Sequence, residues 1–336
     1  MVSASVTLAT FRGFLAMLKV EVMVLAGAMP SSVAITTDAL ATANRLRAVE
    51  GRPLAFALRF SGSGRRIAAH LCAGAGQPSR TDTSGEADLV IVPGLGATTE
   101  AAISERLGRK DVHAAMRALS RVVDRGGAVA ASCSSVFLLA EAGLLGGRRA
   151  TTTWWLAPLF QRTYPAVVLD PDAMVVADGP VTTAGAAMAQ LDLMLALITR
   201  HAGADLAERC ARYLLLDGRR SQAQYMAVGY LAAQDADVVR AERWAREHLA
   251  TGISARELAE AAGLSTRTFA RRVERATGLS PVRFLQRLRV ERAVELLETT
   301  ACTVEEIARR VGYAEPTTLR RLLRRNAGAR PRELRG

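Results

Sequence analysis

The sequence has few aromatic residues and few cysteines, and each scarcity narrows the protein classes to which it can belong. Aromatic residues make up 5% of the 336 residues, while hydrophobic residues of all kinds reach 50%. Small aliphatic side chains therefore dominate, which favours helices and α/β layers over a β-sandwich. The chain has only 4 cysteines, and they are scattered. A long chain of this kind is typical of a reduced, cytoplasmic protein.

The sequence also lacks the signals of a metal site and of a membrane protein. His70 and Cys72 lie close together, but no second pair of ligand-type residues lies near them. No apolar run is long enough to cross a bilayer. Residues 1–16 show no clear pattern of secondary structure, and charged residues from Arg12 onward interrupt the apolar stretch at the N-terminus. Met17 is a candidate for the true first residue of the protein. We expect no metal, no cofactor, no signal peptide and no membrane partner.

The positive charge of the chain is concentrated near its C-terminus. The net charge is +12, and residues 239–336, with 21 Arg, no Lys and 12 Glu, carry +9 of it. A basic region of this size is typical of a domain that binds a polyanion, although a merely soluble basic domain would look the same by charge alone. Lysine is nearly absent, with 42 Arg against 2 Lys. We attribute this bias to a GC-rich genome, so the choice of Arg over Lys at a single position says little about the function of that position.

Strands and helices are predicted to alternate along the first two thirds of the chain. Apolar and alternating runs predict strands at 19–25, 54–60, 88–92, 127–133, 173–177 and 181–184, and helical periodicity predicts helices at 33–48, 111–125, 134–143 and 186–200. This alternation indicates a parallel sheet with helices on both faces. We place the α/β domain at residues 17–225 and a linker at residues 226–238.

Residues 239–336 are predicted to be helical throughout, and one pattern occurs in them twice with an offset of 49 residues. In each copy Ser254 or Thr303 is followed three residues later by Glu, which is a capping box. Gly263 or Gly312 then ends the short helix, and a second capping or first-turn residue opens a basic helix. This order of elements is that of a helix-turn-helix unit. A plain helical bundle with a chance repeat is the alternative.

Residues 281–298 predict one long amphipathic helix between the two units. A rigid connector can hold two basic helices about one turn of DNA apart, roughly 34 Å, so that both enter the major groove. Any single Arg on these helices could instead be solvated surface charge. By helical spacing, the candidate base readers are Arg267, Ala270, Arg271, Thr317, Arg320 and Arg321, and the candidate phosphate contacts are Arg272, Arg324 and Arg325.

The C-terminal region resembles the AraC/XylS-type DNA-binding domain. The resemblance is carried by SARELAEAAGLSTRTFARRVERATGLSPVRFLQRLRVERAVELLETT (254–300) and TVEEIARRVGYAEPTTLRRLLRRNAGARPREL (303–334). Leu319 and Leu323 stand where this family usually has Phe, and Leu334 stands where it often has Tyr. These are apolar replacements in a core. The resemblance implies an all-α domain with two helix-turn-helix units that binds promoter DNA, and it makes RNA polymerase a candidate partner.

Four stretches of the α/β domain carry a second resemblance: DLVIVPGLG (88–96), AASCSSVFLLAEAGLLGGRRATTTWW (130–155), VTTAGAAMAQLDLML (181–195) and SQAQY (221–225). They resemble the DJ-1/PfpI, or class I glutamine amidotransferase-like, family, in the GlxA-like branch that is fused to AraC-type domains. This resemblance implies a flavodoxin-like sheet and a domain that senses a small molecule. We also expect a homodimer.

Cys133 lies where a strand of small residues meets a helix, a junction that forms a nucleophile elbow in this fold. We expect the helix N-terminus to lower the pKa of the thiol. The resemblance places a His at Thr153, a Gly at Ser135 and an acid in the loop 27–32, and this sequence has none of them. Because a thiol without a positioned base is a poor hydrolytic catalyst, we expect no enzymatic activity.

The elbow is then a candidate effector site, formed by Cys133, Ser134, Ser135, Thr153 and Trp154. The ring of Trp154 could hold an apolar or cationic metabolite, or it could belong to the core. Two other functions remain open. One is an amidase or glutaminase with a DNA-binding appendage, and the other is a DNA-binding protein whose α/β domain serves only for assembly.

Overall fold

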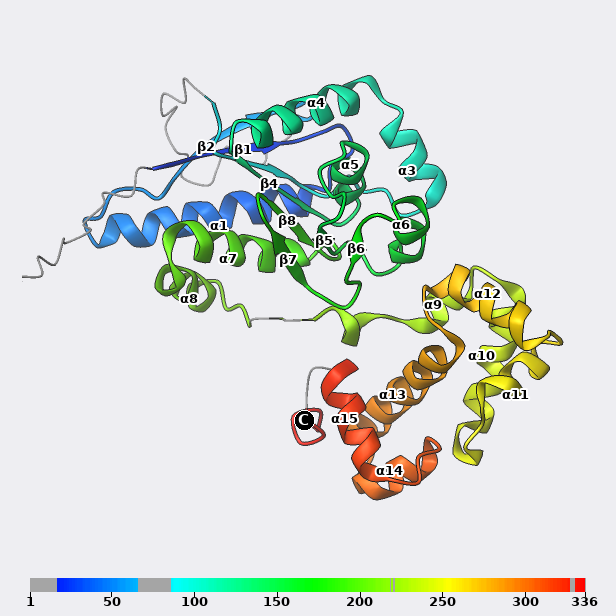
Figure 1. Cartoon of the computed structure of the whole chain (residues 1–336). Helices are drawn as coiled ribbons and strands as arrows, with labels where there is room; N and C mark the ends of the chain where they lie inside the picture. Colours follow the sequence, from blue (N-terminus) through cyan, green and yellow to red (C-terminus); the bar gives the residue numbers. More distant parts are fainter. Residues whose placement is uncertain (1–16, 66–85, 218, 220, 327–329, 336) are drawn as a thin grey trace, which may run out of the picture.

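A computed structural model describes residues 17–65, 86–217, 219, 221–326 and 330–335. An α/β domain is followed along the chain by a helical domain, and the two lie in contact (Figure 1). The expectations for residues 1–16 and for the pair His70 and Cys72 fall outside the described residues. None of the described helices has the length and apolarity that a membrane-spanning helix needs.

The α/β domain is built on a six-stranded sheet in the order β2-β1-β3-β4-β8-β7. Neighbouring strands are parallel except at the edge, where β7 runs antiparallel to β8. The order of the first four strands is flavodoxin-like, as predicted. The strands are β1 (Leu18–Met23), β2 (Phe56–Ser61), β3 (Leu89–Val92), β4 (Ala128–Ser132), β7 (Val175–Asp178) and β8 (Val181–Ala184), and a separate parallel pair is formed by β5 (Arg149–Ala150) and β6 (Val168–Leu169).

Helices cover both faces of this sheet, which confirms the predicted layers (Figure 1). One face packs against α1 (Pro30–Val49), α7 (Ala189–Ala202) and α8 (Ala204–Tyr213). The other packs against α3 (Glu100–Leu107), α4 (Lys110–Asp124) and α5 (Ser135–Glu141), with α6 (Ala157–Thr163) beside them.

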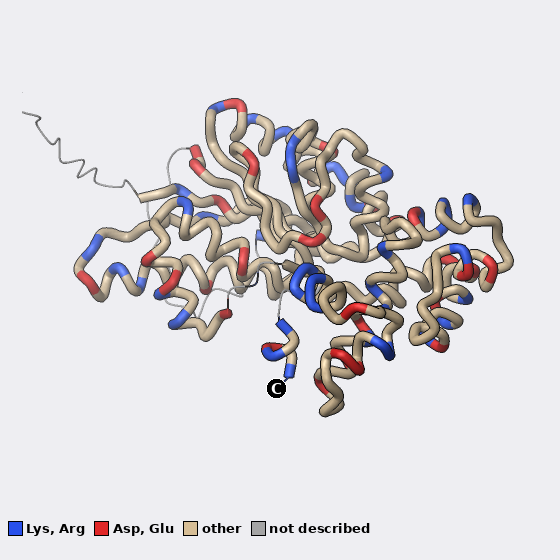
Figure 2. Tube along the Cα trace, turned by 60° about the horizontal axis from the view of Figure 1, so that its bottom comes forward, with Lys and Arg blue, Asp and Glu red and all other residues tan. Residues whose placement is uncertain are grey.

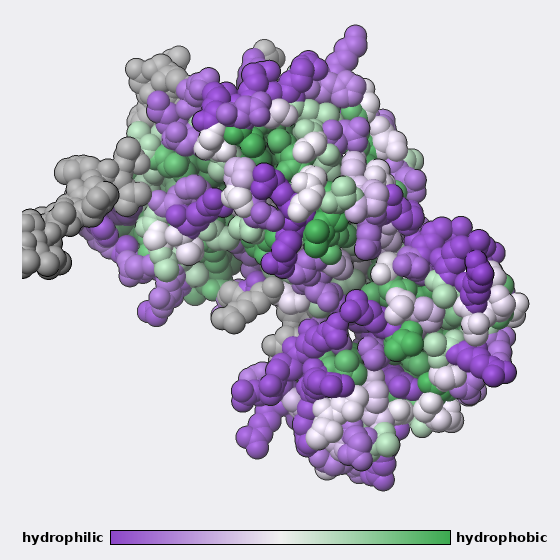
Figure 3. Space-filling view, viewed as in Figure 1, coloured by the Kyte–Doolittle hydropathy of each residue, from purple (hydrophilic) through white to green (hydrophobic). Residues whose placement is uncertain are grey.

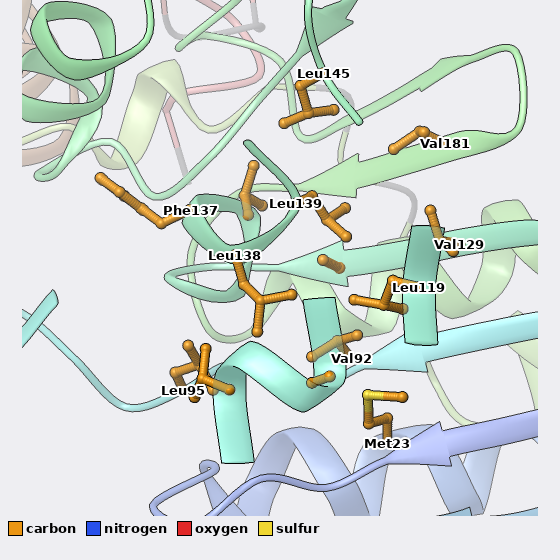
Figure 4. Close-up of a cluster of buried hydrophobic side chains, with 14 of the residues drawn as sticks. Met23, Val92, Leu95, Leu119, Val129, Phe137, Leu138, Leu139, Leu145 and Val181 are labelled. Carbon is orange, nitrogen blue, oxygen red and sulfur yellow. The ribbon is translucent and has the colours of Figure 1, made fainter. Parts of the chain in front are cut away.

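Large apolar side chains fill the space between the sheet and α4 and α5 (Figure 4). Leu119 of α4 and Phe137 and Leu138 of α5 meet Val92 and Val129 of the strands, and each of the five is at most 1% exposed. Burying one such side chain stabilises a fold by about 1.5–3 kcal/mol. This core holds the end of β4 and the start of α5 in place, where the elbow lies.

The helical domain consists of two bundles that share the long helix α13 (Pro281–Thr299). The first bundle contains α9 (Val228–Ala232), α10 (Ala236–His248), α11 (Ala255–Ala261) and α12 (Thr266–Thr277), and the second contains α14 (Val304–Arg310) and α15 (Pro316–Asn326). Both predicted capping boxes are present, at Ser254 and Thr303. Gly263 and Gly312 have the predicted positive φ, 68° and 79°.

The segment 226–238, which we expected to link the domains, forms part of the helical domain. It contains α9 and the beginning of α10. Val228, Ala232 and Val238 are buried in the same core as α10 and α12. The physical reason is tertiary packing, because Val228 and Ala232, four residues apart on α9, and Val238 on α10 are buried against the rest of the bundle.

Candidate DNA-binding surface and effector site

The helix α12 is the second helix of the first helix-turn-helix unit, and its two faces differ in the way that groove binding requires. Phe269 and Val273 are buried against the bundle, at 1% and 0% exposure. Arg267 and Arg271 are exposed on the other face, and Ala270 is half-buried beside them. Ser265 caps the helix by accepting from the amide of Thr268. The predicted inner and outer faces of this helix are therefore correct.

The helix α15 repeats this arrangement in the second unit. Leu319 and Leu322 are buried in the second bundle. The five residues predicted on its outer side are all exposed: Thr317, Arg320, Arg321, Arg324 and Arg325. Figure 2 shows basic segments recurring along the chain, and Figure 3 shows hydrophilic surface over much of the helical domain. Both recognition helices thus present arginines to solvent.

Two of the predicted DNA contacts are engaged in ion pairs within the domain. Arg272 lies 3.2 Å from Asp235 and 2.5 Å from Asp237, which ties α12 to the start of α10. Arg320 lies 2.6 Å from Glu305 of α14, and both of these side chains are about half exposed. Arg320 can exchange this partner at little cost, since exposed pairs contribute about 0–1 kcal/mol.

Asp235 was not singled out from the sequence, although it organises one end of the first bundle. It caps α10 and accepts from the amides of Asp237 and Val238. It also pairs with Arg272 and Arg275. Burial raises the pKa of Asp235, but these amide and guanidinium contacts outweigh burial and hold the pKa below its ordinary value. The cap signal was readable in the sequence, whereas the partners on α12 were not.

Cys133 has the backbone of a nucleophile elbow. Its φ is 56°, a left-handed conformation that is strained for a residue with a side chain. Its amide donates to Gly185 O at 2.8 Å, and its carbonyl accepts from the Thr152 hydroxyl at 2.9 Å. A Cβ on Gly94, in the loop after β3, would lie 3.3 Å from the Cβ of Cys133, so the loop packs tightly against the elbow at this position. The elbow therefore sits at the carboxyl ends of β3 and β4, where α/β folds bind ligands.

The comparisons with known proteins agree with both halves of this geometry. A DJ-1/PfpI family model matches residues 79–200, and a helix-turn-helix domain model matches residues 258–336. The chain joins a DJ-1/PfpI domain to an AraC-type helix-turn-helix domain.

Curated relatives share this architecture. HTH-type transcriptional regulator CdhR of Pseudomonas aeruginosa is 29% identical over 63% of this chain and 64% of its own length. GlxA of Rhizobium meliloti is 29% identical over 66% of this chain and 68% of its own. GbdR of Pseudomonas aeruginosa is 26% identical over 90% of this chain and 80% of its own length. This chain thus spans slightly less than two thirds of CdhR. The names of these relatives support a DNA-binding transcription regulator.

The thiol of the DJ-1/PfpI domain is not activated. Cys133 is only 2% exposed. Burial raises the pKa of its thiol, and the amide and hydroxyl of Ser134 and the hydroxyl of Thr153 lower it by less. Our expectation that the N-terminus of α5 lowers this pKa was wrong, because desolvation of the thiolate outweighs the local donors. The thiol is therefore neutral at physiological pH.

Four of the five predicted effector residues meet at the elbow. Ser134, Ser135 and Thr153 are fully buried beside Cys133, and Ser135 donates to the carbonyl of Pro93. The hydroxyls of Ser134 and Thr153 face the thiol of Cys133, whereas the buried hydroxyl of Ser32, near Gly94, has no hydrogen-bond partner within the described part of the chain. An unsatisfied buried hydroxyl costs about 1–3 kcal/mol.

The fifth residue, Trp154, faces the AraC-type domain. Its ring meets the ring of Tyr230 on α9 edge to face, with centroids 5.7 Å apart. Two polar contacts also join the domains. Arg162 of α6 donates to the carbonyl of Arg275 on α12 at 2.7 Å, and Arg287 of α13 pairs with Asp172 at 2.5 Å. Sequence reasoning found none of these contacts, because each joins residues far apart in the chain.

Proposed function

We propose that this chain is a sequence-specific transcription regulator that binds promoter DNA through both helix-turn-helix units. The observation that carries the proposal is the repeated recognition helix, in which α12 and α15 each bury an apolar face and expose arginines. The shared helix α13 holds the two units in one domain. The helix-turn-helix match and the names of the curated relatives support the same function.

In this proposal the outer faces of the two helices read bases in the major groove. Arg271 and Arg320 are the main candidates, since a bidentate contact between Arg and guanine contributes about 1–3 kcal/mol of discrimination. Arg324 and Arg325 lie farther along α15 and would hold phosphates, which position the protein without reading sequence. Arg272 would reach a phosphate only by leaving Asp235 and Asp237. The further candidates for base contacts are Arg267, Ala270, Thr317 and Arg321.

Binding titrations on an operator selected from random duplexes, and on a scrambled duplex, test this assignment at several salt concentrations. Arg271→Ala and Arg320→Ala should weaken operator binding about 5- to 150-fold and affect the scrambled duplex much less. Arg324→Ala should weaken both equally and reduce the salt slope by about one. Arg212→Ala, an exposed change in the DJ-1/PfpI domain, is the control. Equal losses on both duplexes for Arg271→Ala and Arg320→Ala would refute base reading.

We further propose that the DJ-1/PfpI domain responds to a small-molecule effector at the elbow formed by Cys133, Ser134, Ser135 and Thr153, with Trp154 beside it. The buried hydroxyls around the thiol support this role, because a polar ligand could bond to them and to the unpaired hydroxyl of Ser32. The neutral, buried thiol and the absence of His at position 153 speak against hydrolysis. We therefore propose that the domain is not an enzyme. Turnover of an amide substrate that disappears in Cys133→Ala would favour the amidase or glutaminase alternative.

The remaining parts of the proposal concern the oligomeric state, the cellular location and a further partner. We propose a homodimer, because promoter sites with two half-sites match a protein with twofold symmetry. A regulator of this kind works where the DNA and RNA polymerase are, so we place it in the cytoplasm, with RNA polymerase as a candidate partner. Sedimentation of the full chain with and without operator DNA tests the dimer.

A further inference from the structure

A pocket of about 310 Å³ lies at the junction of the two domains. On one side it is lined by Trp155 and by α6 with the residues just before it, and on the other side by α9, the start of α10 and the end of α12. Figure 1 shows α6 and α12 side by side at this junction. A volume of this size is at the lower end of small-ligand sites, which lie preferentially between domains.

Two hydrogen-bond donors at the pocket, from Trp155 and Arg162, are incompletely paired, although the carboxylates of Glu100 and Asp235 also line it. The indole Nε1 of Trp155 is buried and has no partner among the described residues. Arg162, which is 45% exposed, gives one contact to the carbonyl of Arg275 and lies 3.9 Å from Glu100. The acidic residue Asp235, by contrast, already accepts from two amides and two guanidinium groups. Two incompletely paired donors, one of them charged, suit an anionic ligand.

We propose that this junction pocket binds a small carboxylate with an apolar body. The guanidinium of Arg162 and the indole N–H of Trp155 would donate to the carboxylate, because charge-assisted hydrogen bonds are the stronger kind. Leu156, Pro158 and Leu159 would contact the apolar body. A neutral ligand could not form a charge-assisted bond with Arg162 and would bind less tightly.

This site differs from the elbow and bears directly on DNA binding. One wall of the pocket is the end of α12, where Arg275 and Ala276 lie. Arg162 holds the carbonyl of Arg275, so a carboxylate that recruits Arg162 competes with the contact between α6 and α12. Since a ligand shifts an equilibrium only through contacts that differ between two states, this competition changes how α12 is held. The effect on the operator rests on the proposed function, whereas carboxylate binding does not.

Calorimetric titration of the full chain tests the site with cyclohexanecarboxylate as the probe and cyclohexanecarboxamide as its neutral match. The carboxylate should bind at least about 10-fold more tightly than the amide, and Arg162→Gln and Trp155→Phe should each weaken it about 10- to 100-fold. Arg212→Gln is the matched control for Arg162→Gln, because Arg212 is exposed on α8 and does not line the pocket, and it should change binding less than twofold. Thermal unfolding of each variant establishes that it is folded.

The proposal is overturned if the two probes bind equally, if the carboxylate does not bind at millimolar concentration, or if Arg162→Gln and Trp155→Phe bind it as the wild type does. Loss of binding in Ser134→Phe but in neither pocket variant would also overturn it, since the ligand would then occupy the elbow. Operator binding without ligand is measured separately on the wild type and on Trp155→Phe. Its absence from both would defeat the proposed function and leave the carboxylate result standing.

Discussion

The ion pair between Arg287 and Asp172 provides the clearest test of how the two domains are joined. The side chain of Arg287 is 8% exposed and that of Asp172 is 42% exposed. Arg287 also donates to the carbonyl of Ala223 at 2.9 Å. Replacing Asp172 by Ala removes the only carboxylate that pairs with this guanidinium among the described residues. A buried cation then remains with the carbonyl of Ala223 and the sulfur of Met226 as its partners.

The size of the effect follows from the burial of the two partners. Breaking a fully buried ion pair costs about 3–5 kcal/mol, whereas an exposed pair contributes about 0–1 kcal/mol. Asp172 is partly screened by solvent and Arg287 keeps its bond to Ala223, so we expect an intermediate loss of about 1–2 kcal/mol. This loss corresponds to a 5- to 30-fold increase in local opening of the junction.

Hydrogen exchange measures this opening directly. The amide of Gln222 donates to the carbonyl of Asp172, and that of Tyr225 donates to the carbonyl of Gln222. Both bonds lie beside the contact of Arg287 with Ala223, so these amides should exchange about 5- to 30-fold faster in Asp172→Ala. The control is Glu208→Gln, which removes an exposed pair with Arg212 on α8 and should leave these amides unchanged. Unchanged exchange in Asp172→Ala would refute the reasoning, because it would mean that Ala223 and Met226 hold Arg287 without Asp172.

Three further outcomes are expected. Ser254→Ala and Thr303→Ala should each destabilise the AraC-type domain by about 1 kcal/mol in denaturant titrations, because each removes a helix cap, and a loss below about 0.3 kcal/mol would contradict the capping role. Cys133 should be alkylated far more slowly than the partly exposed Cys302 at pH 8, as followed by mass spectrometry, since burial both raises its pKa and blocks access. Faster modification of Cys133 would show that the thiol is activated after all. Ser134→Phe should abolish the effector response and keep basal DNA affinity, and an unchanged response would favour a domain that serves only for assembly.

Much of the fold was predictable because its signals are short-range. The alternation of strands and helices predicted the parallel sheet, and each of its strands lies within a few residues of the predicted place. The two capping boxes and the glycines that follow them depend on residues within one turn of each other, so the repeated units could be read directly. The inward direction of Phe269 and Leu319 and the outward direction of Arg271 and Arg320 followed from helical spacing alone.

The segment 226–238 shows where prediction from the sequence failed. Residues 226–238 have too short an apolar pattern to predict a helix with certainty from periodicity. Val228 and Ala232 become helical and buried because α10 and α12 provide a surface against which they pack. Tertiary contacts, rather than local preference, stabilise a helix this short.

The sequence by itself determined which residues form the exposed faces of α12 and α15 and which residue stands at the elbow. Only the tertiary structure decided the state of those residues. Arg272 is paired because Asp235, remote in the chain, lies beside it, and Trp154 faces Tyr230 because the two domains meet there. Cys133 is neutral because the sheet, α5 and the loop at Gly94 close around it. Burial and charge pairing depend on neighbours from distant parts of the chain, and no local pattern encodes them.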